Sequence, residues 1–140
     1  MGLVLILSLV LNCRTKTASH DDGVFLSSVK RAAELASAEG KEVFVHVGAD
    51  WCKPCRALHR DIYPQPAVQQ ALSEFVKLEL DMDKLGEEHV ALIRAMNVQS
   101  IPMVAVFASD METLVRKAVV AKADAKWVLD YLKVKPAAEP

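Results

Sequence analysis

Two cysteines separated by two residues, Cys52 and Cys55, have the clearest chemical potential in this 140-residue sequence. Residues three apart on a helix share one face, with Cβ atoms about 5–6 Å apart. A disulfide requires Cα atoms roughly 4.4–6.8 Å apart. The pair can therefore open and close with little backbone movement, and its spacing predicts a redox-active disulfide.

The cysteine pair is expected at the start of a helix that runs from about Cys52 towards Ile62. The first amides and the helix dipole stabilise an anion there, which favours a Cys52 thiolate near neutral pH. The thiolate is the nucleophile in disulfide exchange. Cys55 lies deeper in the helix, so we expect it to be the resolving thiol that attacks the mixed disulfide.

Four neighbours of the pair are expected to support its chemistry: Trp51, Lys53, Pro54 and Asp50. Pro54 stiffens the first turn, where a missing N–H costs nothing. Lys53 adds a positive charge that lowers the Cys52 pKa, and Trp51 offers an apolar platform beside the sulfur. Asp50 tunes the thiol pKa upward, caps the helix, or does both.

A metal site is the main alternative for the same cysteines. Structural zinc normally takes four ligands, and the sequence offers no second cysteine pair. Cys52, Cys55 and His59 can share a helix face, however, so a copper or zinc delivery module stays open. A c-type haem motif is excluded because Arg56 stands where histidine is required. For the redox interpretation we expect no metal and no cofactor besides the disulfide itself.

The overall composition is that of an ordinary globular domain, 52% apolar and 25% charged, with a formal net charge of −1. No block of lysine and arginine is present, so nucleic-acid binding has no electrostatic support. We expect a monomer.

The sequence begins with an apolar run over residues 2–11. A helix that spans a bilayer needs about 20 apolar residues, so this run fits the core of a secretory signal better. Arg14 and Lys16 follow the run, although a signal peptide carries its charges before it. We expect a leader and tether over 1–22, a domain over 23–134 and a disordered tail over 135–140. Export to the periplasm, free or membrane-anchored, would place the cysteines where disulfides matter.

Cys13 ends the apolar run in the sequence Leu9-Val10-Leu11-Asn12-Cys13. This end resembles a bacterial lipoprotein signal, in which the cysteine receives a lipid that attaches the protein to the membrane. Asn12 and Leu11 depart from the small residues of such signals. The alternative is a cysteine that is removed with the leader or left free in the tether.

Periodicity predicts alternating helices and strands. A first helix, capped by Asp21 or Asp22, runs to about Glu39, and a last helix is capped by Asp124. Between them we expect strands at 43–47, 75–81, 103–107 and 114–120, and helices at 52–62, 67–73 and 86–96. This order predicts an α/β sandwich with a mixed sheet between helices, because the last two strands are close enough for a hairpin.

The run Phe44-Val45-His46-Val47-Gly48-Ala49-Asp50-Trp51-Cys52-Lys53-Pro54-Cys55 resembles the thioredoxin family, and the resemblance covers roughly 25–132. The stretches 49–52 and 61–71 look most like exported members such as the C-terminal domain of the thiol:disulfide interchange protein DsbD. The resemblance implies a thioredoxin fold and a protein thiol–disulfide oxidoreductase. Its partners would be protein thiols and disulfides, with an upstream thiol protein as electron donor, since no Gly-rich dinucleotide motif is visible.

Ile101-Pro102 also matches the family, where this bond is a cis peptide facing the cysteines. The resemblance implies that the Ile101 backbone pairs with an extended substrate segment beside Cys52. An ordinary trans proline at the start of an edge strand is the alternative.

The sequence departs from the family pattern at several positions. His46 stands where members often carry a buried acid that assists proton transfer, so it either takes a proton from Cys55 or is a core histidine. Lys53 replaces a glycine. Lys77 lies near the buried acid in the family, and here we expect it to pair with a strand neighbour. We predict an exported disulfide reductase or interchange protein, with a non-catalytic thioredoxin-like adaptor as a further alternative.

Overall fold

The chain folds around a four-stranded mixed sheet whose strand order is β2-β1-β3-β4, in a computed structural model that describes residues 24–120, 122 and 124–133. β1 (Val43–Gly48) pairs in parallel with β2 (Val76–Asp81). β3 (Met103–Phe107) is antiparallel to both β1 and β4 (Leu114–Val119). β1 therefore lies in the interior of the sheet, between β2 and β3.

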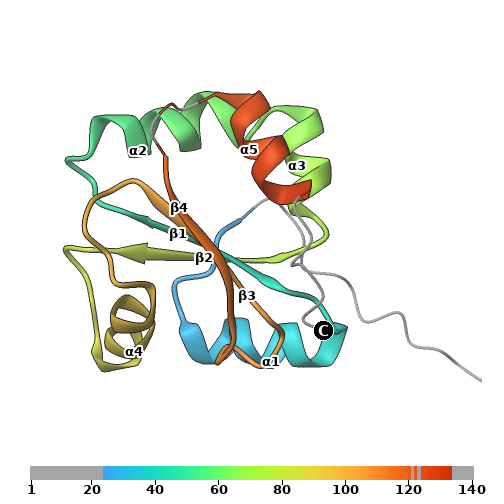
Figure 1. The fold of residues 1–140 in the computed structure, drawn as a ribbon, viewed down its shortest axis with the longest axis vertical. Coiled ribbons are helices and arrows are strands. Elements are labelled where there is room, and N and C mark those ends of the chain that lie inside the picture. Colours follow the sequence, from blue (N-terminus) through green and yellow to red (C-terminus); the bar gives the residue numbers. More distant parts are fainter. Residues whose placement is uncertain (1–23, 121, 123, 134–140) are drawn as a thin grey trace, which may run out of the picture.

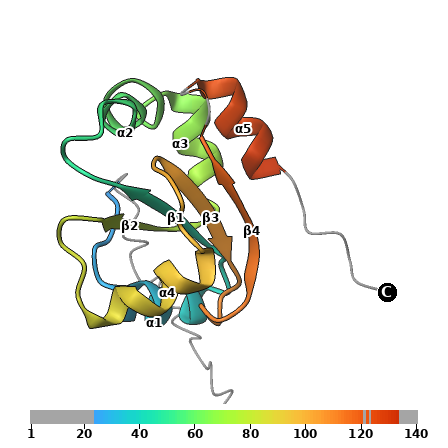
Figure 2. The same cartoon turned by 60° about the vertical axis from the view of Figure 1, so that its left-hand side comes forward.

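Helices cover both faces of the sheet (Figures 1 and 2). On one face lie α1 (Val29–Glu39) and α4 (Glu87–Met96). On the other lie α2 (Lys53–Ala57) with its π-helical continuation η1 (Leu58–Ile62), α3 (Pro66–Leu72) and α5 (Ala125–Lys133). The predicted α/β sandwich is confirmed. Among the described residues, no helix is long and apolar enough to cross a bilayer.

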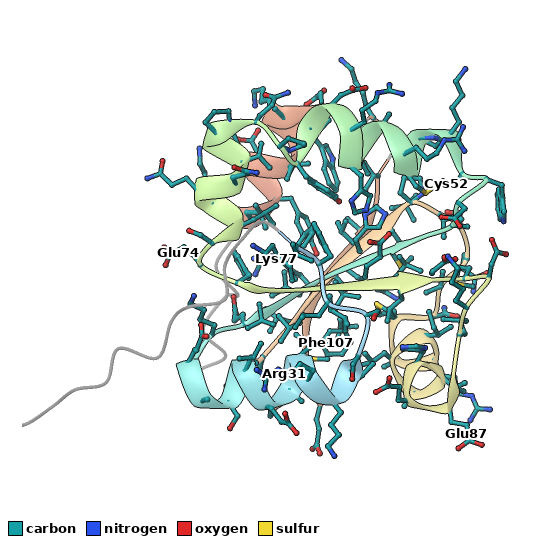
Figure 3. All side chains as sticks on the ribbon, turned by 180° about the vertical axis from the view of Figure 1, so that it is seen from behind. Arg31, Cys52, Glu74, Lys77, Glu87 and Phe107 are labelled. Carbon is teal, nitrogen blue, oxygen red and sulfur yellow. A yellow bond between two sulfur atoms is a disulfide. The ribbon has the colours of Figure 1, made fainter. Side chains whose placement is uncertain are left out.

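Strand alternation divides the core into two layers. Val43, Val45 and Val47 face α1 and α4, where fully buried Phe107 also lies (Figure 3). Phe44 faces the opposite layer with Leu58 and the other side chains of η1, α3 and α5. His46 alternates with the valines in the same way as Phe44. The register therefore places this histidine beneath the helical segment that follows the cysteines.

The first helix begins later than expected, at Val29 instead of near Asp21 or Asp22, which lie outside the described residues. Ser28 caps it, because its hydroxyl oxygen accepts the Arg31 N–H at 3.3 Å. Leu26 is extended and pairs with β2, donating to Lys77 O at 2.9 Å and accepting from Glu79 N at 2.8 Å. Leu26 is therefore extended because it pairs with unoccupied backbone groups on the edge of β2, although the sequence pattern predicted a helix here.

The expected leader and tether at 1–22 and the expected tail at 135–140 also lie outside the described residues. The expected domain boundaries and the fate of Cys13 therefore stay predictions. The remaining helices and strands begin and end within two residues of the predicted bounds, and Asp124 caps α5 by accepting the Trp127 N–H at 2.7 Å.

Candidate active site

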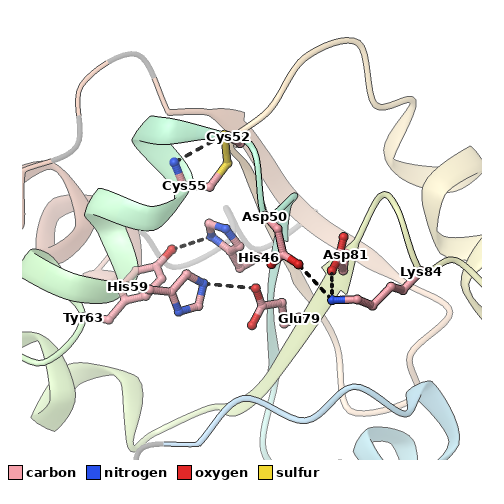
Figure 4. Close-up of polar contacts among 9 residues, drawn as sticks. All are labelled: His46, Asp50, Cys52, Cys55, His59, Tyr63, Glu79, Asp81 and Lys84. Carbon is pink, nitrogen blue, oxygen red and sulfur yellow. Dashed lines mark hydrogen bonds and ion pairs between the residues drawn. A yellow bond between two sulfur atoms is a disulfide. The ribbon is translucent and has the colours of Figure 1, made fainter.

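Cys52 and Cys55 form a disulfide at the start of α2, with sulfurs 2.01 Å apart and Cα atoms 5.2 Å apart (Figure 4). Both residues are almost fully buried. Cys52 is the N-cap of the helix, and its sulfur accepts the Cys55 N–H at 3.3 Å. The cysteine spacing and the helix start therefore coincide, and a thiolate on Cys52 would meet a backbone donor that is already in position.

Trp51 and the residues between the cysteines form the exposed rim of the site. The Trp51 side chain is 67% exposed, and its indole N–H donates to Asp83 Oδ1 at 3.3 Å. Lys53 and Pro54 are exposed in the first turn of α2. An exposed apolar ring thus immediately precedes the disulfide in the chain.

The loop before β3 contacts the same site. The Ile101–Pro102 peptide bond is cis, and Pro102 is buried. Ile101 packs against the small cluster formed by Ala49, Cys52 and Cys55. The backbone of this loop therefore lies next to the redox pair.

Asp50 is not the helix cap, because Cys52 takes that position. Its carboxylate instead binds Lys84 Nζ at 3.1 Å, and its carbonyl oxygen accepts from Arg56 Nη1 at 2.6 Å. Lys84 also binds Asp81 at 2.7 Å. Hydrogen bonds to the two carboxylates raise the pKa of Lys84, and the Lys84 ammonium lowers the pKa of Asp81. Asp50 therefore belongs to a charge network with Lys84 and Asp81.

His46 is wholly buried on β1, and its Nδ1 lies 2.8 Å from the Tyr63 hydroxyl oxygen. Burial is the main cause that lowers the pKa of His46 to about 3, with a smaller contribution from His59. Burial likewise raises the pKa of Tyr63. Both rings are therefore neutral at ordinary pH. The second ring nitrogen of His46, Nε2, has no hydrogen-bond partner among the described residues.

Gly48 allows His46 and Cys55 to approach each other. A Cβ at this position would stand 2.7 Å from His46 Nε2 and 3.3 Å from Cys55 Sγ. His46 Nε2 and Cys55 Sγ are therefore at most 6.0 Å apart, on the same side of the strand. A glycine is required here by close contact and not by backbone conformation, because a side chain would fill the space between the histidine and the sulfur.

His59 and Glu79 complete a polar cluster with His46 (Figure 4). His59 Nε2 lies 3.3 Å from Glu79 Oε1, and the His59 ring meets His46 edge to face with centroids 4.7 Å apart. The hydrogen bond from His59 is the main cause that lowers the pKa of Glu79. His59 therefore associates with His46 and Glu79, whereas the metal alternative placed it with the cysteine pair.

Tyr63 and Glu79 also belong to the site, although they are not among the residues predicted from the sequence. The spacing of Cys55, His59 and Tyr63, four residues apart, was a usable signal, because such residues share a helix face. Glu79 is the register partner of His46 across β1 and β2. Lys77, two residues earlier, is buried on the same side of β2 and opposite Phe44 (Figure 3).

A pocket of about 360 Å³ connects His59 and Glu79 to solvent. Cys55, His59 and Glu79 line it, together with Ala49, Asp50, Arg56, Arg60 and Asp81. Protons or small ions can therefore reach Cys55 from solvent through a polar opening.

Known proteins share both the sequence pattern and the fold. Residues 24–109, more than half of the chain, match a family model described as thioredoxin-like. The chain is 30% identical over 105 residues to the thiol:disulfide interchange protein DsbD of Yersinia pestis, an overlap of 75% of this chain and 18% of DsbD. It thus spans less than a fifth of that relative.

Two solved structures extend the comparison. The reduced C-terminal domain of DsbD from Neisseria meningitidis superposes with a TM-score of 0.56 and 26% identity, over 74% of this chain and 90% of that domain. A thioredoxin variant from Halobacterium salinarum gives 0.59 and 25% identity, over 89% and 99%. With its mixed sheet and a Cys52–Cys55 disulfide at the first helical turn after β1, the chain belongs to the thioredoxin-like family.

Proposed function

We propose that the protein is a thiol–disulfide oxidoreductase that reduces or exchanges disulfides of other proteins through Cys52 and Cys55. The observation that carries this proposal is the Cys52–Cys55 disulfide at the cap of α2, next to the Ile101–Pro102 loop. The similarity to DsbD supports the same class of reaction.

In the proposed reaction, the Cys52 thiolate of the reduced protein attacks one sulfur of a substrate disulfide. The substrate disulfide breaks, a mixed disulfide forms, and the first substrate sulfur leaves as a thiolate. Cys55 then loses its proton and attacks the Cys52 sulfur, which releases the second substrate thiolate. Two electrons have passed to the substrate, and another dithiol protein must supply two electrons to reduce Cys52–Cys55 again.

Cys55 must lose its proton before it attacks. Many family members carry a buried carboxylate near this thiol, whereas here His46 takes that position. His46 is the nearest candidate acceptor, but a group with a pKa of about 3 is a far weaker base than a thiolate, whose ordinary pKa is about 8.5. We therefore assign His46 a supporting role, as a neutral ring fixed by Tyr63. The proton leaves through the solvent-connected pocket that Cys55 lines.

Substrate contacts are proposed on the exposed side of the disulfide. The Ile101 backbone offers hydrogen-bonding groups to an extended segment, and the exposed Trp51 ring offers an apolar surface. Lys53 supports a low Cys52 pKa from the surface.

We also propose that the protein is exported, on the basis of the apolar run at 2–11, with Cys13 as the site of a membrane-anchoring lipid. Expression of the full chain in a Gram-negative bacterium, followed by fractionation and mass measurement, tests both points. A periplasmic or membrane-bound product supports export, and an added lipid mass that disappears in Cys13→Ser supports lipidation. Retention of the unmodified chain in the cytoplasm contradicts both.

Insulin reduction tests the redox function directly. We expect dithiothreitol-dependent turnover by the wild type and none by Cys52→Ser or Cys55→Ser. Cys55→Ser should accumulate a mixed disulfide through Cys52, which non-reducing gels detect, whereas Cys52→Ser should not. Turnover by both variants would contradict the proposal, and equilibration with glutathione buffers would place the protein on the reducing or oxidising side.

A further inference from the structure

Three side chains from three different elements bring metal-binding atoms together behind the disulfide. His46 comes from β1, His59 from η1 and Glu79 from β2 (Figure 4). One ring nitrogen of each histidine and one carboxylate oxygen of Glu79 lie within 4.8 Å of one another. His59 Nε2 and Glu79 Oε1 are already 3.3 Å apart, which is close to the spacing of two ligands on one zinc ion.

The unpartnered nitrogen of His46 is the second observation that points to a ligand. A buried polar atom without a hydrogen bond costs about 1–3 kcal/mol, so native structures rarely keep one. His46 Nε2 is such an atom among the described residues. Its other nitrogen is held by Tyr63 at 2.8 Å, and metal-binding histidines are commonly oriented by a hydrogen bond of this kind.

Solvent access and a fourth ligand come from the adjoining pocket. The His59 and Glu79 side chains are 31% and 40% exposed, and the pocket of about 360 Å³ that they line also reaches Cys55. Cys55 Sγ is at most 6.0 Å from His46 Nε2. Zinc holds nitrogen at about 2.0–2.1 Å and sulfur at about 2.3 Å, so these two atoms must come within about 4.4 Å of each other.

We propose that the protein binds one Zn²⁺ ion through His46, His59 and Glu79, with the Cys55 thiolate as a fourth ligand that exists only after the disulfide is reduced. On binding, the Cys55 thiol releases one proton to solvent and a zinc–sulfur bond forms, while no electron moves. In the oxidised protein the same sulfur is committed to Cys52 and cannot be a thiolate. The affinity for zinc therefore depends on the redox state of the disulfide.

This site has two functional consequences. A zinc-bound Cys55 cannot resolve a mixed disulfide, so zinc inhibits turnover. Zinc that binds the reduced form more tightly by a given factor must also shift the thiol–disulfide equilibrium towards the dithiol by that factor at saturation. The ion would thus report or control whether the protein is reduced.

Zinc binding by the full chain tests the proposal without any substrate. ZnCl₂ is titrated against a chromogenic chelator, with the reduced protein kept in a phosphine reductant. We expect one ion per chain and at least tenfold tighter binding by the reduced form. Co²⁺ as a probe should give visible d–d bands in both forms and a near-ultraviolet thiolate-to-cobalt band only after reduction.

Variants identify the ligands. His59→Gln and Glu79→Gln are preferred because both side chains are partly exposed. Circular dichroism of each variant checks that it folds. Each should weaken reduced-state zinc binding at least tenfold, whereas Cys55→Ser should lose the thiolate band and bind no more tightly than the oxidised protein. His89→Gln on α4 is the matched control and should bind like the wild type.

Two results would overturn the proposal. One is the absence of stoichiometric binding in both redox states. The other is binding that survives His59→Gln and Glu79→Gln but is lost in Cys52→Ser, because the cysteine pair alone would then hold the ion. Neither result bears on insulin reduction, so this proposal and the redox function fail independently.

Discussion

The Tyr63 hydroxyl oxygen lies 2.8 Å from His46 Nδ1 and ties the helical segment after the cysteines to the central strand. Tyr63 closes the π-helical turn, since its backbone N–H donates to Leu58 O at 2.8 Å. Both side chains are buried and neutral. The position of His46 beside Cys55 therefore depends on a bond between two uncharged groups, and several measurable effects follow.

Tyr63→Phe should destabilise the protein by about 1–3 kcal/mol, because it leaves His46 Nδ1 buried without a partner. Urea unfolding at neutral pH measures the loss. The same substitution in a His46→Leu background should cost clearly less, since no nitrogen is then left unpaired. Equal losses in the two backgrounds would show that the hydrogen bond contributes nothing specific.

Stability should fall as the pH falls below 6.5 because of His46. Its pKa is 6.5 when unfolded and about 3 when folded, so the unfolded chain binds more protons between these values. Stability in this window therefore rises with pH, with a maximum slope of about 1.4 kcal/mol per pH unit. In the folded protein, the His46 ring faces three titratable side chains: His59, Glu79 and Tyr63.

Urea unfolding in EDTA at several pH values checks this slope. The range from pH 5 to 6.5 isolates His46, because Glu79 has an ordinary pKa of 4.5 and loses its contribution at lower pH. His46→Leu should flatten the slope in that range. A variant that keeps the wild-type slope would assign the pH dependence to other groups.

Gly48→Ala should destabilise the protein by about 1–3 kcal/mol and change the reactivity of the disulfide. Its Cβ would stand 2.7 Å from His46 Nε2 and 3.2 Å from Cys55 Cβ, so one of them must move. Gly40→Ala is the matched control. It costs about 1 kcal/mol through a left-handed backbone but meets nothing within 4 Å.

The rate at which dithiothreitol reduces Cys52–Cys55 separates these two glycine variants. We expect a changed rate for Gly48→Ala and a wild-type rate for Gly40→Ala, although both lose stability. Identical rates for all three proteins would mean that the contact between strand and sulfur is irrelevant to the chemistry.

Lys84→Met should raise the pKa of Cys52 while changing stability by less than about 1 kcal/mol, because its ion pairs are exposed. Lys84 offsets the charges of Asp50 and Asp81, and without it these carboxylates oppose a thiolate. The pH dependence of iodoacetamide alkylation measures the pKa. Asp50→Asn combined with Lys84→Met should reverse most of the shift, and raised salt should reduce it. An unchanged pKa would remove Asp50 from the set of supporting residues.

The order of helices and strands could be predicted because each has a local signal. A run of β-branched and aromatic residues marked β1, and the cap residue Asp124 marked the start of α5. The cysteine pair also has a local sequence signal, since the spacing of Cys52 and Cys55 determines how close they lie on a helix. The resemblance, and not any spacing, pointed to Pro102 and to the unusual position of His46.

The polar cluster behind the disulfide could not be predicted in the same way. His46 meets Glu79 only through the parallel register of β1 and β2, which joins residues 33 positions apart. The spacing of His59 and Tyr63 indicates that they share a helix face with Cys55, but the π-helical turn that brings them to His46 has no periodic sequence signal. Leu26 was assigned to a helix because propensity takes no account of an open sheet edge elsewhere in the chain.

That short pairing of Leu26 with β2 affects how molecules of this protein meet one another. β2 is an outer strand, and the two hydrogen bonds to Leu26 occupy the middle of its free edge. At the opposite edge, β4 carries the adjacent charges of Arg116 and Lys117. Blocked or charged edges oppose the addition of a strand from a second chain. The two edges of the sheet thereby protect the protein against aggregation through its own strands.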